Sequence, residues 1–286
     1  MADPRDRGVI RNVLLVTVSG VATLYDKGRY HSYMPMLFWT AVDSGHRMQT
    51  ASDLRYVAHL DMLGMSDLAM RNPDLAWEVL SQLTKAKQDR LGLGLQKIDT
   101  GEFIQDRITS FTFSDTIIVF SRSDEPADTQ AIVLLVTELF SSALHYCIPL
   151  RGGIAHGRFM FNLEHNLFAG PALVQAYRLS EEAQWLGLRV DQEVAERSAR
   201  VPIRSGRGKP AVIPWSTPLK AGEVEDSLVI DWVETHRNNF QVKPPIGVAE
   251  FYAPFARLFG PFDALPDAVR TKYENTVVFI NDRLSQ

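Results

Sequence analysis

Two aspartates, Asp61 and Asp115, occupy positions from which carboxylates can hold metal ions. Asp61 follows residues 55–60, a run of extended character whose alternate side chains face opposite sides of a strand. Asp115 separates two β-rich runs, 108–113 and 116–120, and is predicted to lie at a hairpin tip. Carboxylates placed in this way can hold two divalent cations about 4 Å apart, which activate an attacking oxygen and neutralise the phosphates that it attacks. The simpler alternative for Asp115 is a side chain that caps its own turn.

The loop after Asp61, residues 62–66, is a second candidate for ligand contact. It contains Gly64 and opens a predicted helix, so its backbone N–H groups are candidate ligands for an anion. Loops at the carboxyl ends of strands commonly carry ligand sites in α/β sheets. The residues expected to contact a bound ligand here are Met62, Leu63, Gly64 and Met65.

The spacing of apolar residues predicts the elements that position these groups. In chain order they are a helix over 66–91 broken at Asn72-Pro73, a hairpin over 108–120, a helix over 129–146, a strand over 150–155 ended by a turn at His156-Gly157, and a helix from Gly170 toward Gly187. The order β-α-β-β-α-β, followed by α, is the split ferredoxin-like pattern. We therefore expect an α+β fold.

The remaining C-terminal residues have a different character. They comprise a Pro-, Gly- and basic-rich stretch over 198–224 that predicts a long arm or loop, a strand over 228–233 and a terminal helix over 263–284. A basic cluster in the arm, Arg204, Arg207 and Lys209, fits either a solvated loop or a contact with phosphate or nucleic acid. The chain is thus divided into an N-terminal extension (1–50), a core (51–195) and a C-terminal part (196–286).

Composition excludes several classes of protein. The chain has 286 residues and a formal net charge of −4, so it can bury a full core and lacks the basic excess of a non-specific nucleic-acid binder. Cys147 is the only cysteine, which rules out an internal disulfide. The apolar run over 13–24 is too short to span a bilayer and predicts a buried strand or an amphipathic extension, with no insertion into a membrane.

Four motifs in sequence order resemble the catalytic domain of class III nucleotidyl cyclases. They are Asp61 with Gly64, the Phe113-Ser-Asp115 hairpin, Arg151-Gly-Gly-Ile-Ala-His-Gly157 and Gly170-Pro-Ala-Leu-Val-Gln-Ala-Tyr-Arg178. Within that superfamily the chain looks most like the bacterial pyrimidine cyclases of Pycsar anti-phage systems. The resemblance covers residues 54–187, which is under half of the chain.

The resemblance implies a two-metal mechanism at a dimer interface. Asp61, Asp115 and the backbone carbonyl of Met62 would hold two Mn²⁺ or Mg²⁺ ions. The ribose 3′-hydroxyl would attack the α-phosphorus and yield a 3′,5′-cyclic nucleotide and pyrophosphate. Arg178 would reach the transition-state phosphate of a partner subunit, so the enzyme would be a homodimer. The alternative for Arg178 is a surface ion pair with Glu181 or Glu182.

Departures from the family pattern bear on the choice of base. Ser114 stands where the family usually has a Gly before the hairpin Asp. Val174 stands where the family usually has an Asn, and the adjacent Gln175 could supply the missing amide. The positions that read adenine in adenylate cyclases are here Phe111 and Leu167, which cannot form charge-assisted hydrogen bonds with a purine edge. Aromatic Phe111 and Phe113 would favour a smaller pyrimidine by steric exclusion. We expect UTP as the substrate, and CTP as the next candidate, with Arg107, His59 or Arg55 as the residue that recognises the base. Apart from this, we expect His59 and His156 to be hydrogen-bonded scaffold residues.

The resemblance also implies a cellular role. A cytoplasmic cyclase would use the triphosphate pool and make cyclic UMP, which a separate effector would sense during phage infection. Three rivals remain open: a conventional adenylate or guanylate cyclase, a catalytically silent cyclase-like module that binds nucleotide, and a dinucleotide synthase of the related palm fold.

Overall fold

A computed structural model describes residues 53–91, 107–201, 203, 210–240 and 246–285, together with four two-residue strands near the N-terminus. The chain separates into two compact units, Met1–Gln49 and Thr50–Gln286. In the first unit β1 (Thr17–Val18) pairs with β2 (Val21–Ala22), and β3 (Tyr25–Asp26) with β4 (Arg29–Tyr30). The rest of the apolar run 13–24, and the basic cluster Arg204, Arg207 and Lys209, lie outside the described residues.

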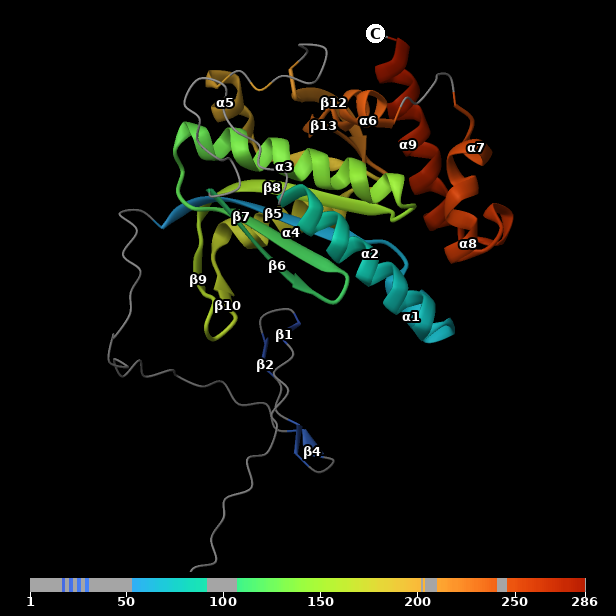
Figure 1. The fold of residues 1–286 in the computed structure, drawn as a ribbon, viewed down its shortest axis with the longest axis horizontal. Helices are drawn as coiled ribbons and strands as arrows, with labels where there is room; N and C mark the ends of the chain where they lie inside the picture. Colours follow the sequence, from blue (N-terminus) through green and yellow to red (C-terminus); the bar gives the residue numbers. More distant parts are fainter. Residues whose placement is uncertain are drawn as a thin grey trace, which may run out of the picture. The chain divides into compact units, whose positions relative to one another are not determined.

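The second unit is built on one seven-stranded sheet of order β12-β13-β11-β8-β5-β7-β6 (Figure 1). Its strands are β5 (Leu54–Met62), β6 (Ile108–Phe113), β7 (Thr116–Ser121), β8 (Leu150–Arg158), β11 (Leu188–Val190), β12 (Val212–Pro218) and β13 (Val224–Ile230). The four strands β8-β5-β7-β6 are antiparallel neighbours. This is the strand order of the split β-α-β-β-α-β unit, so the predicted α+β fold is confirmed.

Helices surround this sheet and a small hairpin extends from it. The helices are α1 (Met65–Arg71), α2 (Pro73–Leu91), α3 (Pro126–His145), α4 (Pro171–Glu182), α5 (Gln192–Arg200), α6 (Trp232–Phe240), α7 (Val248–Tyr252), α8 (Ala256–Phe259) and α9 (Asp267–Ser285). The hairpin pairs β9 (Met160–Asn162) with β10 (Leu167–Ala169). The predicted break at Asn72-Pro73 is confirmed, because it separates α1 from α2.

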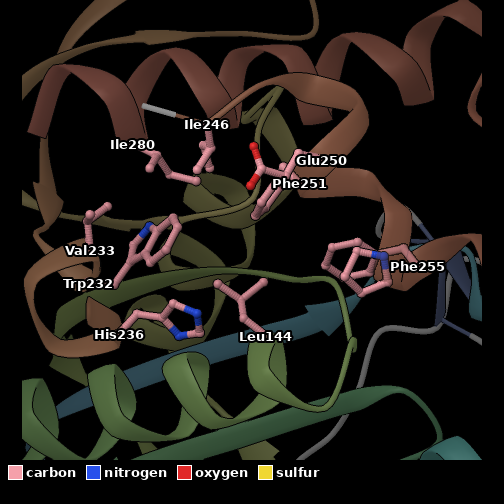
Figure 2. Close-up of a pocket in the computed structure, with 10 residues that line it drawn as sticks. Leu144, Trp232, Val233, His236, Ile246, Glu250, Phe251, Phe255 and Ile280 are labelled. Carbon is pink, nitrogen blue, oxygen red and sulfur yellow. The ribbon is translucent and has the colours of Figure 1, made fainter. Parts of the chain in front are cut away.

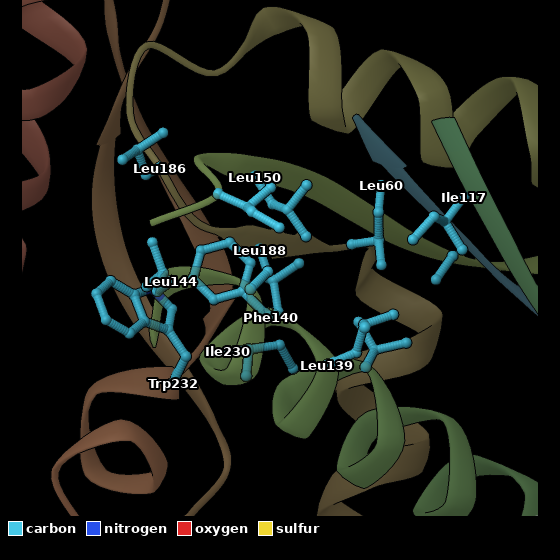
Figure 3. Close-up of a cluster of buried hydrophobic side chains, with 14 of the residues drawn as sticks. Leu60, Ile117, Leu139, Phe140, Leu144, Leu150, Leu186, Leu188, Ile230 and Trp232 are labelled. Atoms are coloured by element: carbon cyan, nitrogen blue, oxygen red, sulfur yellow. The ribbon is translucent and has the colours of Figure 1, made fainter. Parts of the chain in front are cut away.

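The alternation of side chains along β5 gives the sheet two apolar faces. Tyr56, Ala58 and Leu60 belong to the larger core, which also contains Leu139 and Phe140 of α3 (Figure 3). Val57 points the opposite way, into a smaller cluster with Phe120, Phe159 and Ala172. As a result α3 covers one face of β5, and α4, which carries Ala172, covers the other.

Contact between α4 and the sheet is unusually close at a glycine of β8. A Cβ atom on Gly153 would lie 2.3 Å from the carbonyl oxygen of Ala176 and 2.6 Å from Cβ of Leu179. Only a residue without a side chain allows this approach. The glycine therefore fixes the height of α4 above the strand that also carries Arg151.

Helix α3 is the one described helix whose length and composition would allow it to cross a membrane. Most of it is buried inside the protein, with 78% of the apolar window covered. This burial is the pattern of a core helix, and α3 packs on the sheet accordingly.

Four predictions about where helices, strands and loops begin or end were wrong. The strand expected to turn at His156-Gly157 continues to Arg158, because it stays paired with Leu54 and Arg55 of β5. The helix expected to run toward Gly187 ends at Glu182. The predicted arm over 198–224 contains strand β12, and the strand predicted over 228–233 ends at Ile230, before α6.

We expect Gly153→Ala to destabilise the protein by about 2–3 kcal/mol, because the added methyl group overlaps α4 backbone. Urea denaturation gives the free energy of unfolding. Gly247→Ala is the matched control, since nothing lies within 4 Å of the Cβ position there. Equal stability of the two variants would show that α4 does not pack on β8 at this distance.

Candidate active site

The end of β5 and the β6–β7 hairpin bring Asp61 and Asp115 together. Asp61 pairs in register with Thr116, the residue after Asp115. The backbone N–H of Met62 donates to the carbonyl oxygen of Asp115 at 3.1 Å. Ser114 adopts φ 53°, a left-handed conformation that tightens the hairpin tip and that usually favours glycine. The structure thus places Asp115 beside the end of β5.

Arg151 of β8 neutralises Asp61 from the adjacent strand. Asp61 and Arg151 are register partners, and the guanidinium donates from Nε (3.0 Å) and Nη2 (2.8 Å) to Oδ2 of Asp61. Nη2 also donates to Oε1 of Glu181 on α4, and Glu181 in turn accepts from Nζ of Lys220 at 2.9 Å. Burial raises the pKa of Asp61, and the charge of Asp115 acts in the same direction, whereas Arg151 opposes both. The four side chains form one connected ionic network.

The two aspartates fit a pair of hard divalent cations. Asp115 forms no side-chain hydrogen bond or ion pair within the described part of the chain, so the alternative of a self-capped turn is not observed. No group of three or more His, Cys, Asp or Glu side chains there could hold a metal. Metals at Asp61 and Asp115 would therefore take their other ligands from backbone carbonyl, phosphate and water oxygens, which suit Mg²⁺ and Mn²⁺.

Part of the predicted anion-binding loop is already occupied. The N–H of Met62 bonds to Asp115 and that of Leu63 bonds to the carbonyl of Pro149 at 2.9 Å, so neither can serve as an anion ligand. Met65 is buried, whereas Gly64 is exposed and has φ 77°. The contact of this loop with a ligand stays a prediction, in which the Met62 and Leu63 amides take no part because Asp115 and Pro149 already accept from them.

The C-terminal part of the chain supports this loop. The ring of Phe259, at the end of α8, lies against Gly64, where a Cβ atom would come within 2.8 Å of it. The carbonyl of Leu258 also accepts from Nη2 of Arg71 in α1 at 3.3 Å. Helix α8 therefore holds both the loop and the helix that the loop opens.

Arg178 does not join the two aspartates within one chain. It lies on the exposed side of α4 with Val174, Gln175 and Tyr177, opposite the buried Ala176. Glu181 pairs with Arg151 and Lys220, and Glu182 pairs with Arg189. The alternative of an ion pair between Arg178 and either glutamate is therefore not observed.

The residues considered for base recognition are scattered. Phe111 packs on Phe168 of β10 with ring centroids 4.6 Å apart, and Phe113 is 73% exposed at the hairpin. Leu167 is also exposed. Two of the residues proposed to recognise the base have other partners: Arg55 donates to the Ser121 carbonyl, and Arg107 pairs with Glu125 and Asp128.

His59 is the candidate for base recognition that lies near Asp61, two residues before it on β5. Its Nδ1 lies 3.3 Å from Oγ of Ser180, and its ring packs edge-on against Tyr177. Burial lowers the pKa of His59 to about 4, and the charge of Arg151 contributes in the same direction. His59 is therefore neutral at physiological pH and bonded to α4, as a scaffold histidine would be.

Sequence reasoning assigned no role to Arg151, Glu181 or Lys220 in the site. Arg151 was part of a recognised motif, and Glu181 was considered only as a partner of Arg178. One signal was available: Arg151 lies between Leu150 and the Gly152-Gly153-Ile154-Ala155 run of a predicted buried strand, and a charged residue is buried there only if it has a partner.

A separate cavity of about 210 Å³ lies between α3, α6, α7 and α9 (Figure 2). It is lined mainly by apolar and aromatic side chains, among them Leu144, Trp232, Phe251 and Phe255, with His236 at one side. None of the predicted site residues lines it. The cavity is therefore distinct from the site at Asp61.

We expect Arg151→Met to destabilise the fold by about 2–3 kcal/mol, because it leaves Asp61 and Glu181 partly buried without their shared cation. Urea denaturation at pH 7 measures the effect. Adding Asp61→Asn to Arg151→Met should recover part of the loss. Arg158→Met is the matched control: its pair with Asp53 is exposed, and the change should cost less than about 0.5 kcal/mol. Equal losses for the two arginines would contradict a structural role for the network.

Comparisons with known proteins give matches among solved structures alone; no family model and no curated protein matches the chain. A bacterial light-regulated adenylyl cyclase is 10% identical, with a TM-score of 0.43 over 72% of this chain and 96% of that chain. The catalytic core of a rhodopsin-guanylyl cyclase with converted specificity, in complex with ATPαS, is 12% identical, with a TM-score of 0.45 over 62% and 94%. A class III adenylyl cyclase-like ATP-binding protein from Pseudomonas aeruginosa is 12% identical, with a TM-score of 0.39 over 80% and 46%. At these values the function has to be argued from the site.

Proposed function

We propose that the protein is a nucleotidyl cyclase that converts a pyrimidine nucleoside triphosphate to a 3′,5′-cyclic monophosphate and pyrophosphate. The observation that carries the proposal is the approach of Asp61 and Asp115 at the end of β5. Their place in the sequence, with Gly64 between them, matches the resemblance to class III cyclases. Two adjacent carboxylates, of which Asp115 forms no ion pair with any described residue, are suited to divalent cations and the phosphates that the cations bind.

The side chains of the site have separate tasks in this reaction. Asp61, Asp115 and the Met62 carbonyl would hold the cations, which when bound lower the pKa of the ribose 3′-hydroxyl and neutralise phosphate charge. Gly64 is exposed, so its backbone is the part of this loop that the phosphates could contact. Arg151 keeps Asp61 ionised and in position until the ligand is bound.

Catalysis would require a second copy of the chain. Arg178 lies on the exposed face of α4 and forms no hydrogen bond or ion pair with the rest of the described chain. Val174 and Tyr177 on the same face are each 49% exposed, an apolar surface typical of an interface. A homodimer that covers this face would bring Arg178 to the phosphates bound by the partner, where a guanidinium stabilises transition-state charge.

The proposal of a pyrimidine substrate depends on the absence of polar side chains at the two positions that contact a purine in adenylate cyclases. Phe111 and Leu167 occupy the positions at which adenylate cyclases read a purine, and neither can form a polar bond with the base. UTP is the favoured substrate and CTP the next. The resemblance to Pycsar cyclases further suggests a cytoplasmic signal generator in anti-phage defence, whose product is sensed by a separate effector.

Incubation with each of the four nucleoside triphosphates and Mn²⁺, followed by mass spectrometry, tests the reaction. We expect cyclic UMP as the main product, and Asp115→Ala should abolish it while leaving the unfolding transition unchanged, since Asp115 forms no side-chain bond within the described structure. Cyclic AMP or cyclic GMP as the main product would place the protein among conventional cyclases. A linked dinucleotide, or no product from any triphosphate, would reject the proposal.

Complementation between inactive variants tests the dimer. Asp115→Ala and Arg178→Ala should each be inactive alone, because each removes an essential group from both sites of a homodimer. Co-expressed, they form heterodimers with one intact site, so roughly a quarter of wild-type activity should return if subunits mix at random. No recovery in a verified heterodimer would mean that Arg178 does not act across the interface.

A further inference from the structure

Helix α9 docks directly on the segment that follows α4. The carbonyl of Ala268 accepts from Nε2 of Gln184 at 2.7 Å, and Nδ2 of Asn275 donates to the Gln184 carbonyl at 2.8 Å. The next residue, Thr276, accepts at Oγ1 from the N–H of Leu186 at 2.8 Å. These α9 residues share one helix face, and Lys272, four residues after Ala268 and four before Thr276, lies on the same face.

The same segment carries the ionic network of the site. Glu181 and Glu182 end α4, and the Glu182 carbonyl accepts from the N–H of Lys220 at 2.8 Å. The N–H of Gln184 bonds to the carbonyl of Pro218 at 2.9 Å, which ties the β12–β13 turn to this point. Helix α9 and Lys220 therefore approach Glu181 and Arg151 together.

Lys272 is a partly buried cation without a counter-ion of its own. Its ammonium forms no hydrogen bond or ion pair with any residue that the structure describes, whereas its backbone carbonyl accepts from Oγ1 of Thr276 at 2.6 Å. Burial lowers the pKa of Lys272 to about 8; the charges of Arg151 and Lys220 act in the same direction, and those of Glu181 and Asp61 oppose them. The charges of the network therefore act on Lys272, and the hydrogen bonds of α9 to Gln184 place this helix at the end of α4 that carries Glu181.

The local charges leave a place for an anion. Arg151, Lys220 and Lys272 are three cations, and the carboxylates whose charges act on Lys272 are Glu181 and Asp61. Glu181 is already shared by Arg151 and Lys220, and Asp61 by Arg151. A partly buried ammonium without a counter-ion is unfavourable, so a further negative group beside Lys272 would stabilise its charged form. A polyphosphate beside Asp61 would supply that charge.

We infer that Lys272 binds the triphosphate of the substrate, so that a helix outside the resembling core forms part of the active site. The inference rests on the proposed function and assigns the phosphate end of the substrate to the side of the site that faces α9. Lys272 is then a substrate-binding residue, which holds the phosphates while the aspartates hold the cations. A Lys side chain suits this task because its ammonium acts as a mobile point charge.

Binding of inorganic tripolyphosphate to the full-length protein, in buffer with a chelator to exclude metals, tests the inference without catalysis. Isothermal titration calorimetry should show that Lys272→Met weakens binding about tenfold, as expected for loss of one charge-assisted hydrogen bond. Lys272→Arg should retain most of the affinity because it keeps the charge. Lys85→Met is the matched control: it removes an exposed lysine on α2, away from the site, and should leave affinity unchanged.

The outcomes separate this inference from the proposed function. Equal affinity of Lys272→Met and Lys85→Met, or no binding of tripolyphosphate by the wild-type protein, would overturn the role of Lys272 whatever the product assay shows. Weakened binding by Lys272→Met with no cyclic product from any triphosphate would retain the phosphate site and reject the cyclase. If both hold, Lys272→Met should raise KM for the triphosphate with a smaller change in kcat, and Lys272→Arg should reverse most of that change.

Discussion

The guanidinium of Arg151 is the interaction on which the candidate site depends. It bonds to Asp61 on the neighbouring strand and to Glu181 on the helix above, so one planar cation connects sheet, helix and acidic centre. Such a group is suited to two carboxylates at once because its donors are arranged in a rigid fork. Removing two anions from water is unfavourable, and a shared partner is the way in which the fold makes their burial tolerable.

The geometry around this cation depends on small residues of β8. Gly153, two residues after Arg151, allows α4 to approach the strand until its backbone is in contact, which brings Glu181 within reach. On the same strand, Gly152 faces Leu60 and Leu188 from the other side of the sheet, where a methyl group would also overlap them. Gly153 thus sets the distance between α4 and β8, and at this distance Arg151 of β8 reaches Glu181 of α4.

Local patterns were sufficient to predict the α+β class, the hairpin that carries Asp115 and the break between α1 and α2. Tertiary contacts decided the remaining boundaries. Helix α4 ends at Glu182 because Ala183 forms a bridge with Leu219 and Gln184 bonds to Pro218. The prolines of β12 suggested a loop, yet β12 is an edge strand of the sheet, where a residue without an N–H is tolerated. Charges contributed by Lys220 and Lys272 to the Asp61 region could not be predicted, because they come from parts of the chain remote in sequence.

The contact of Phe259 with Gly64 has a consequence for how the protein is made. During synthesis the segment that ends at Asp61 leaves the ribosome far ahead of α8 and α9, and early parts of a chain begin to fold before later ones exist. Until α8 and α9 are made, the loop at Gly64 lacks its contact with Phe259, and Asp61 and Glu181 lack the nearby charge of Lys272. Nascent chains of this protein would complete the candidate site late in translation, after the sheet has formed.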